Sequence, residues 1–144
     1  MELLDVLNVL PQMMGTLMGD FQSSVEEINE TQQRVLLLLS ETDDVTMTMV
    51  SRMMNMEKGS MTPVIDKLIA LGFLERERNP LDRRKYILIL TQNGIQIAEK
   101  LSDEINAHMR KKFSVLSGDV NDQVMEAFST IQQAMELIEK GNQP

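Results

Sequence analysis

Hydrophobic residues recur at helical spacing over the first part of the chain. Between residues 2 and 28 they follow steps of three and four, which predicts one amphipathic helix. They are Leu3, Leu7, Leu10, Met14, Leu17, Phe21, Val25 and Ile28. Pro11 interrupts this stripe and removes a helical hydrogen bond, so we expect it to kink the helix or to divide it in two.

Two shorter helices follow. Asn29 with Gln32 three residues later indicates a capping box, which opens a helix that ends near residues 41–44. Thr46 is a favourable N-cap residue for a short third helix at about residues 47–54.

The spacing of the apolar residues then changes. A turn at residues 55–59 leads into a fourth helix that ends at about Leu71, where Gly72 fits the C′ position. Residues 73–78 and 85–90 are short and rich in β-formers, and an Asn-Pro-Leu-Asp turn separates them. This pattern predicts a β-hairpin.

The last third of the chain is again helical in pattern. Thr91 caps a long helix that runs to about Lys112. Ser117 or Asn121 opens a final helix, which ends at Gly141. The order therefore predicts a mainly α fold with a small β-hairpin, in which a winged helix-turn-helix is flanked by N- and C-terminal helices.

Charge is unevenly distributed along this chain. The whole sequence carries a net charge of −8, yet residues 46–90 hold eight basic and five acidic residues, a net of +3. The remainder therefore carries −11. A binding face for nucleic acid depends on the local charge rather than on the molecular sum, so the basic middle segment is compatible either with DNA binding or with ordinary scatter of surface charge.

Composition excludes several classes of site. The chain has no Cys and one His, His108, so no thiolate nucleophile, disulfide or Cys-based metal site is expected. No catalytic constellation, cofactor motif or metal cluster stands out, and we expect no enzyme. The acidic N-terminus is unlike a signal peptide, and the aliphatic run at residues 35–39 is too short for a membrane span. We therefore expect a cytoplasmic protein.

One motif joins the hairpin to the following helix. Residues 82–94 read Asp-x-Arg, five residues, Leu-Thr, two residues, Gly. This pattern resembles the signature of the MarR (multiple-antibiotic-resistance regulator) family, and the order of helices agrees over essentially the whole chain. The resemblance implies one domain over 1–144, with a DNA-binding part at 30–92 and dimerisation helices at 1–28 and 93–142.

The wing supplies the first group of candidate DNA-binding residues. Arg is suited to a narrow groove of negative potential because it is permanently charged and weakly hydrated. The resemblance implies that Arg84 enters the minor groove and that Arg83 and Lys85 contact phosphates. Asp82 is expected to cap the turn and to orient Arg84 through a bidentate pair. A hairpin with a solvated charged tip is the alternative.

The fourth helix supplies the second group, because its N-terminal residues are the ones nearest to base edges in the major groove. Ser60 and Thr62 can bond bases or phosphates, Lys58 and Lys67 phosphates, and Gly59 allows close approach of the backbone or is only a turn glycine. Met61 is expected either to touch a thymine methyl group or to lie in the core.

Two residues depart from the family pattern. Pro63 stands where a basic or polar groove-facing residue is common, so it either kinks the helix or marks a later start near residues 60–62. Glu57 is acidic beside the groove, which favours an N-cap over a phosphate contact.

Methionine is unusually dense before and within the fourth helix. Six of the thirteen are Met47, Met49, Met53, Met54, Met56 and Met61. A copper(I) site is one interpretation, and adaptable filling of a small core is the favoured one, since neither Cys nor His lies nearby.

The expected partners follow from the family. We expect a homodimer on a pseudo-palindromic operator in double-stranded DNA, because two recognition helices must reach successive major grooves. The terminal helices carry apolar stripes that a small winged domain cannot cover. The resemblance further implies repression, and release by a small aromatic or anionic effector in a cleft of the first, second and fifth helices. An acidic helical adaptor that binds protein through its winged domain is the alternative, and a surface or dimer-packing role is expected for His108.

Overall fold

The computed structural model describes residues 3–141, so residues 1–2 and 142–144 of the expected 1–144 domain lie outside the described part. The chain divides into two compact units. Residues 18–106 form the first, called here the winged unit, and the residues up to 17 and from 107 form the second, called the terminal unit. The single domain over 1–144, with its DNA-binding part at 30–92, stays a prediction.

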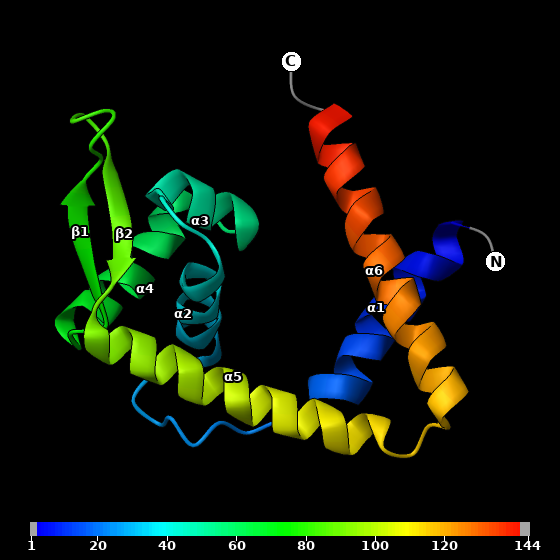
Figure 1. The fold of residues 1–144 in the computed structure, drawn as a ribbon. Helices are drawn as coiled ribbons and strands as arrows, with labels where there is room; N and C mark the ends of the chain where they lie inside the picture. Colours follow the sequence, from blue (N-terminus) through cyan, green and yellow to red (C-terminus); the bar gives the residue numbers. More distant parts are fainter. Residues whose placement is uncertain (1–2, 142–144) are drawn as a thin grey trace. The chain divides into compact units, whose positions relative to one another are not determined.

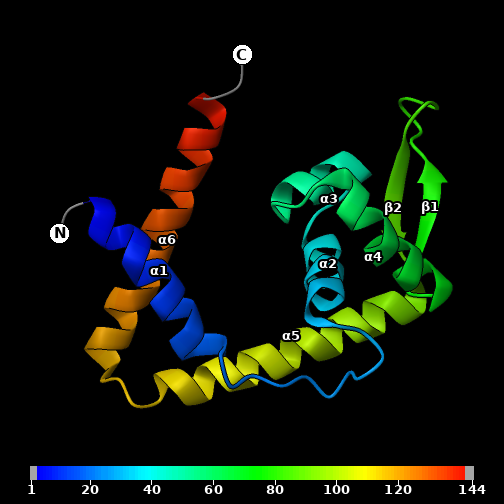
Figure 2. The same cartoon turned by 180° about the vertical axis from the view of Figure 1, so that it is seen from behind.

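The winged unit contains the helix-turn-helix and the hairpin (Figure 1). A mainly helical fold with one small hairpin was expected, and the structure confirms it. The elements of this unit are α2 (Glu30–Glu41), α3 (Met47–Met53), α4 (Lys58–Ala70), β1 (Leu74–Arg78), β2 (Tyr86–Leu90) and the first part of α5 (Gln92–Phe113). Seen from behind in Figure 2, α4 lies between α3 and the hairpin.

The starts of α2 and α3 follow from their capping residues. At α2 the Asn29 side chain accepts from the Gln32 backbone N–H at 2.9 Å, and the Gln32 side chain accepts from the Asn29 N–H at 2.9 Å. This is the reciprocal capping box that the sequence predicts. At α3 the Thr46 hydroxyl accepts from the Met49 N–H at 3.3 Å, which confirms the second cap.

The end of α4 is set by Gly72, as predicted. Gly72 has φ +76°, a left-handed conformation that glycine adopts without a Cβ clash. Its N–H donates to the Ile69 carbonyl at 2.9 Å, and the Phe73 N–H donates to the Leu68 carbonyl at 3.0 Å. These two bonds satisfy carbonyls that the end of the helix would otherwise leave free, and they turn the chain directly into β1.

The hairpin is antiparallel, with Leu74 opposite Leu90 and Arg78 opposite Tyr86. The free edge of β2 is partly covered by the segment that enters α3, because the Leu88 N–H donates to the Val45 carbonyl at 2.8 Å. This pairing attaches the wing to the helix-turn-helix and limits their relative movement.

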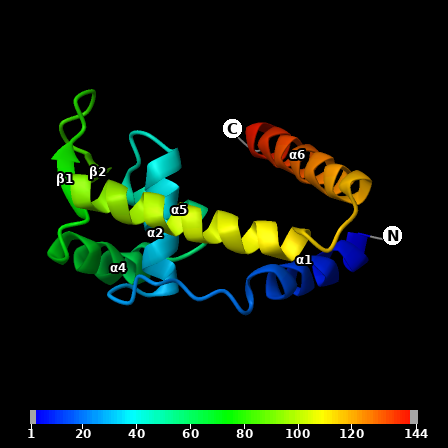
Figure 3. The ribbon, with the colours of Figure 1, turned by 60° about the horizontal axis from the view of Figure 1, so that its bottom comes forward.

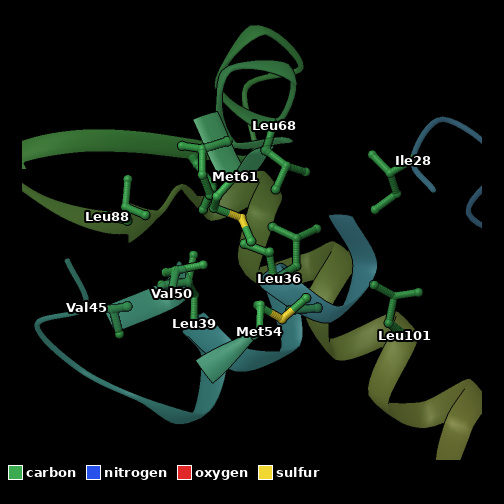
Figure 4. Close-up of a cluster of buried hydrophobic side chains, with 14 of the residues drawn as sticks. Ile28, Leu36, Leu39, Val45, Val50, Met54, Met61, Leu68, Leu88 and Leu101 are labelled. Atoms are coloured by element: carbon green, nitrogen blue, oxygen red, sulfur yellow. The ribbon is translucent and has the colours of Figure 1, made fainter. Parts of the chain in front are cut away.

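The hydrophobic core lies between the helices of the winged unit and β2 (Figure 4). Its fully buried members come from six different elements or loops, so no pair of elements alone would exclude water from it. The largest are Leu36, Met61, Ile65, Leu68, Leu74, Leu101, Val35, Val45 and Val50. Burial of these side chains is the main stabilising contribution to this unit.

The C-terminal half of the Asp-x-Arg…Leu-Thr-x-x-Gly motif is a structural junction. Thr91 caps α5 by accepting from the Gly94 N–H at 3.0 Å, and its hydroxyl donates to the Gly72 carbonyl at 2.6 Å. A Cβ on Gly94 would collide with the carbonyl group of Phe73. Glycine is therefore required at position 94 for α5 to start this close to the end of α4.

The prediction of one helix over residues 2–28 is wrong at its C-terminal end. Helix α1 (Leu3–Met18) ends before Gly19, and the Phe21 N–H donates to the Met18 carbonyl in a turn. The last two residues of the predicted stripe, Val25 and Ile28, instead insert into the core from an irregular segment that contains a turn. Glycine is a poor helix former, and core burial of this segment outweighs its helical periodicity. Pro11 does not divide α1, which runs through it.

The segment between α1 and α2 is attached to α5 by a carboxylate. Glu104 accepts from the Ser23 hydroxyl and the Ser24 N–H, both at 3.1 Å, and also from the Ser24 hydroxyl. These bonds, foremost that from the Ser24 hydroxyl, hold the pKa of Glu104 below its ordinary value despite some opposing desolvation. The ionised carboxylate therefore stabilises this attachment.

The terminal unit consists of α1, the last part of α5 and α6 (Gly118–Gly141). Ser117 precedes α6 and accepts from the Val120 N–H at 3.5 Å, so it, rather than Asn121, opens the last helix. The His108 Nε2 lies 2.7 Å from the Leu17 carbonyl oxygen, to which it donates. The single histidine therefore bonds within its own chain, and it is half-buried rather than on the open surface.

Helix α6 leaves most of its large apolar side chains exposed. Figure 3 shows it standing apart from α1, and no residue of α6 is buried. The exposed large apolar residues of α1 and α6 are Leu4, Val6, Leu7, Val9, Leu10, Met14, Val120, Met125, Ile131, Met135, Leu137 and Ile138. Within residues 3–141, no helix is long and apolar enough to cross a membrane.

Candidate nucleic-acid interface

A basic cleft opens between α3, the start of α4 and the hairpin, with a volume of about 830 Å³. It brings together four predicted site residues from two separate stretches of sequence, Lys58 and Thr62 on α4 and Arg84 and Lys85 in the wing. The full lining is Thr46, Met47, Thr48, Met49, Arg52, Lys58, Thr62, Arg76, Arg84, Lys85 and Tyr86. We call it the basic cleft.

The turn at the tip of the wing is held by Asp82. Its carboxylate accepts from the Arg84 N–H at 3.1 Å, and its carbonyl accepts from the Lys85 N–H at 2.9 Å. The expected turn cap is therefore present. The expected bidentate pair with Arg84 is not formed. The second carboxylate oxygen lies 4.0 Å from the Lys85 Nζ instead, because the Asp82 side chain is directed toward the backbone of the turn.

Both wing arginines are available to a partner. Arg83 and Arg84 are exposed, and among the residues that the structure describes neither guanidinium makes a hydrogen bond or an ion pair. The tip stands clear of α3 and α4 in Figures 1 and 3. A cation that is held on a fixed turn and has no partner in its own chain suits an external anion.

The start of α4 presents short polar side chains. Glu57 occupies the N-cap position, as expected, but its side chain makes no capping hydrogen bond. Lys58, Gly59 and Ser60 are all exposed. The Thr62 hydroxyl donates to the Lys58 carbonyl at 3.0 Å and keeps its lone pairs free to accept. Apart from Lys58, this end of the helix therefore presents small hydrogen-bonding groups that would not block a close approach of DNA.

Met61 is not part of the exposed surface. It is completely buried, with an exposed fraction of 0%, so the expectation that it contacts DNA is wrong and the core alternative is confirmed. It lies on the same face of α4 as Ile65 and Leu68, which are also buried.

Four of the other five methionines of this region lie in the core or against it. Met54 is buried, and Met47, Met49 and Met56 pack against the core cluster, while Met53 is 47% exposed. Unbranched thioether side chains adapt to the irregular spaces of a small core, so the filler interpretation accounts for their arrangement.

Pro63 lies inside α4. Because the helix starts at Lys58, the alternative of a later start near residues 60–62 is wrong, and Pro63 falls in the second turn rather than the first. Proline at an interior position has no N–H to donate to the carbonyl four residues earlier, here that of Gly59, and costs about 3 kcal/mol. The ring is exposed.

Two arginines of the basic cleft were not singled out as site residues from the sequence. Arg52 comes from α3 and Arg76 from β1, and the Arg76 guanidinium pairs with Asp66 of α4 at 2.7 Å. Both belong to the basic segment at residues 46–90, and this local charge is the only feature of the sequence that pointed to them. Only the packing of β1 against α4 shows that they face the same cleft.

The charges of the winged unit are separated onto two clefts. The basic cleft is lined by five cations and no carboxylate. A second cleft, between the end of α2, β2 and α5, contains five carboxylates and no Lys or Arg. Its acids are Glu41, Asp43, Asp44, Glu99 and Asp103. An extended anion is therefore attracted to one side of this unit and repelled from the other.

Comparison with known proteins identifies this architecture. Residues 28–86 match the model of the MarR family. The chain is 33% identical over 97 residues to the uncharacterized HTH-type transcriptional regulator YkoM of Bacillus subtilis, covering 67% of this chain and 63% of that protein. It is 26% identical over 95 residues to the multiple antibiotic resistance protein MarR of Salmonella typhimurium, covering 66% and 65%. The chain thus spans about two thirds of the length of these relatives.

Solved structures show the same fold. Wild-type MarR from E. coli in its apo form has a TM-score of 0.74 at 20% identity, covering 91% of this chain and 97% of that one. A MarR transcriptional regulator from Methanosarcina mazei has a TM-score of 0.69 at 19% identity, covering 93% and 96%. The winged helix-turn-helix with flanking helices is confirmed by these likenesses.

Proposed function

Because residues 28–86 place this chain in the MarR family of transcriptional regulators, we propose that it binds a pseudo-palindromic operator as a homodimer and represses transcription. In this proposal α4 enters the major groove and the wing reaches the adjacent minor groove. The repressor role follows from the family resemblance.

One observation carries the DNA-binding proposal. The basic cleft combines Arg52, Lys58, Arg76, Arg84 and Lys85 without a carboxylate in its lining, although the whole chain has a net charge of −8. An acidic protein that concentrates its cations on one face around a helix start and a hairpin tip presents the charge pattern that a DNA backbone requires. Lys67 lies outside this lining but is exposed on α4, where we propose a phosphate contact.

The dimer proposal rests on the exposed apolar side chains of α1 and α6. Leu7 is 65% exposed, Leu137 69% and Ile138 56%. Many exposed large apolar side chains on one helix are typical of an interface. A two-fold partner that covers both helices would also duplicate the basic cleft, which a palindromic operator requires.

A small anionic effector is the remaining part of the proposal. The acidic cleft described above repels anions, so we expect an anionic effector to bind at the basic cleft. An anion bound there would compete with DNA for the same cations, so we expect effector and operator binding to exclude each other.

The test is to select bound fragments from the source genome with the purified protein and to titrate the selected duplex at several salt concentrations. We expect a sequence-specific complex whose affinity falls steeply with salt, because phosphate contacts release counterions. Lys67→Ala should reduce the salt slope by about 1 for each protomer without changing sequence preference. Binding that ignores both sequence and salt would favour the protein-binding adaptor instead.

A further inference from the structure

The exposed face of α4 carries a proline whose position the fold does not explain. With 3.6 residues per turn, position 63 lies nearly opposite the buried positions Met61, Ile65 and Leu68. The Pro63 ring is exposed and is not among the apolar residues that pack against the core cluster. A residue that weakens its helix and contributes nothing to the core is expected where function requires it.

The neighbours of Pro63 make its ring prominent. Gly59, one turn earlier on the same face, has no side chain, and a Cβ there would meet nothing within 4 Å. Ser60 and Lys67 flank the ring with a small hydroxyl and a long flexible cation, both exposed. The face therefore presents one rigid apolar group between polar ones, at the part of the helix that the proposed docking directs toward base edges.

We propose that Pro63 is a specificity-determining residue that packs against the C5-methyl group of a thymine in the major groove. The thymine methyl is the apolar group that base pairs present in that groove, and small apolar side chains recognise it. A proline ring is suited to this contact because it is rigid and loses no rotamer entropy on binding. This inference rests on the proposed function and names the base that the recognition helix reads.

The experiment is a double-mutant cycle between the ring and the methyl group. The selected operator is synthesised with deoxyuridine in place of each thymine in turn, which removes only the methyl group, and affinity is measured by fluorescence anisotropy. We expect one thymine per half-site at which uracil lowers wild-type affinity about fourfold, the effect of one methyl group that loses its buried contact. Pro63→Ala should lose a similar factor on the thymine operator and become insensitive to uracil at that position.

The stability of the Pro63→Ala variant and a control variant make the possible results of this experiment distinguishable. Pro63→Ala removes a helix-breaking residue, so the variant is expected to fold at least as stably as the wild type. Pro11→Ala is the matched control, because it removes the exposed proline inside α1 and should keep the wild-type response to uracil. Equal uracil sensitivity of wild type and Pro63→Ala at every thymine would overturn this inference and leave operator binding intact. Absence of any sequence-specific complex with the wild type would instead refute the proposed function, and this inference with it.

Discussion

At the scale of single residues, the functional candidates are side chains whose bonding capacity the chain itself leaves unused. Arg84 is exposed on a turn that Asp82 holds through its backbone, whereas Arg76 is already paired with Asp66. An unpaired cation contributes more binding free energy at a phosphate or in a groove than a paired one does, because no existing ion pair must be broken. The two arginines are therefore expected to differ in their contribution to DNA binding.

Arg84→Ala should weaken operator binding by about 1–3 kcal/mol, the range for a good groove contact. The measurement is an anisotropy titration at fixed salt. Arg34→Ala is the control, because Arg34 is an exposed arginine of α2 outside the basic cleft and its loss should change affinity little. Equal affinities of Arg84→Ala and the wild type for the operator would show that Arg84 of the wing does not contact DNA.

Glu104 provides a prediction in pH. Its pKa is lowered in the folded chain from an ordinary value of 4.5, so its stabilising effect is present above that value and is lost as the pH falls through the folded pKa. Wild type should therefore be more stable than Glu104→Gln at neutral pH, and the difference should shrink at acid pH below about 4.5. Urea unfolding at several pH values measures this, and a difference that stays constant with pH would contradict it.

At the scale of elements, the decisive contacts lie at the junctions where one helix or strand ends and the next begins. Gly72 closes α4, the Thr91 hydroxyl bonds back to it, and α5 then starts against the Phe73 carbonyl. The wing is fixed at its base by this junction and at its edge by the bond between Leu88 and Val45. The position of the wing tip relative to α4 depends on both attachments.

Gly94→Ala should destabilise the winged unit by about 1–3 kcal/mol, the usual cost of overpacking, because the added methyl group collides with backbone rather than with a flexible side chain. The change is measured as a lower urea midpoint. Gly118→Ala is the matched control, since a Cβ at that position meets nothing within 4 Å, and its midpoint should be almost unchanged. Similar midpoints for the two variants would show that the junction can relax.

At the scale of the whole molecule, the chain consists of two compact units with different surfaces. The winged unit has a complete core and two clefts of opposite charge. The terminal unit has long amphipathic helices, and no residue of α6 is buried. A unit with an incomplete core requires a partner, which is why we expect the regulator to assemble through these helices.

Ile138→Asp on α6 should raise the dissociation constant of the dimer by about a hundredfold or more, because a carboxylate would be buried without a partner. Sedimentation at several protein concentrations measures this. Ser129→Asp introduces the same charge on a different face of α6 and should leave the dimer intact. A dimer that tolerates Ile138→Asp as well as Ser129→Asp would place the interface elsewhere.

Features that depend on near neighbours in the chain could be predicted from the order of the amino acids. Caps at Asn29, Thr46 and Thr91, the stop at Gly72 and the hairpin are local hydrogen-bonding and conformational preferences, and all of them appear in the structure. The charged wing tip could be located for the same reason, since its residues are consecutive.

Only the tertiary structure decided which side chains meet across long stretches of sequence. It placed Met61 in the core and away from the groove, drew Val25 and Ile28 out of a helical pattern into that core, and brought Arg52 and Arg76 to the basic cleft. The periodicity of a sequence predicts whether a residue is buried or exposed. Which other residues surround it depends on how distant segments pack. Burial is a property of the packed chain, because water is excluded by all the surrounding elements together.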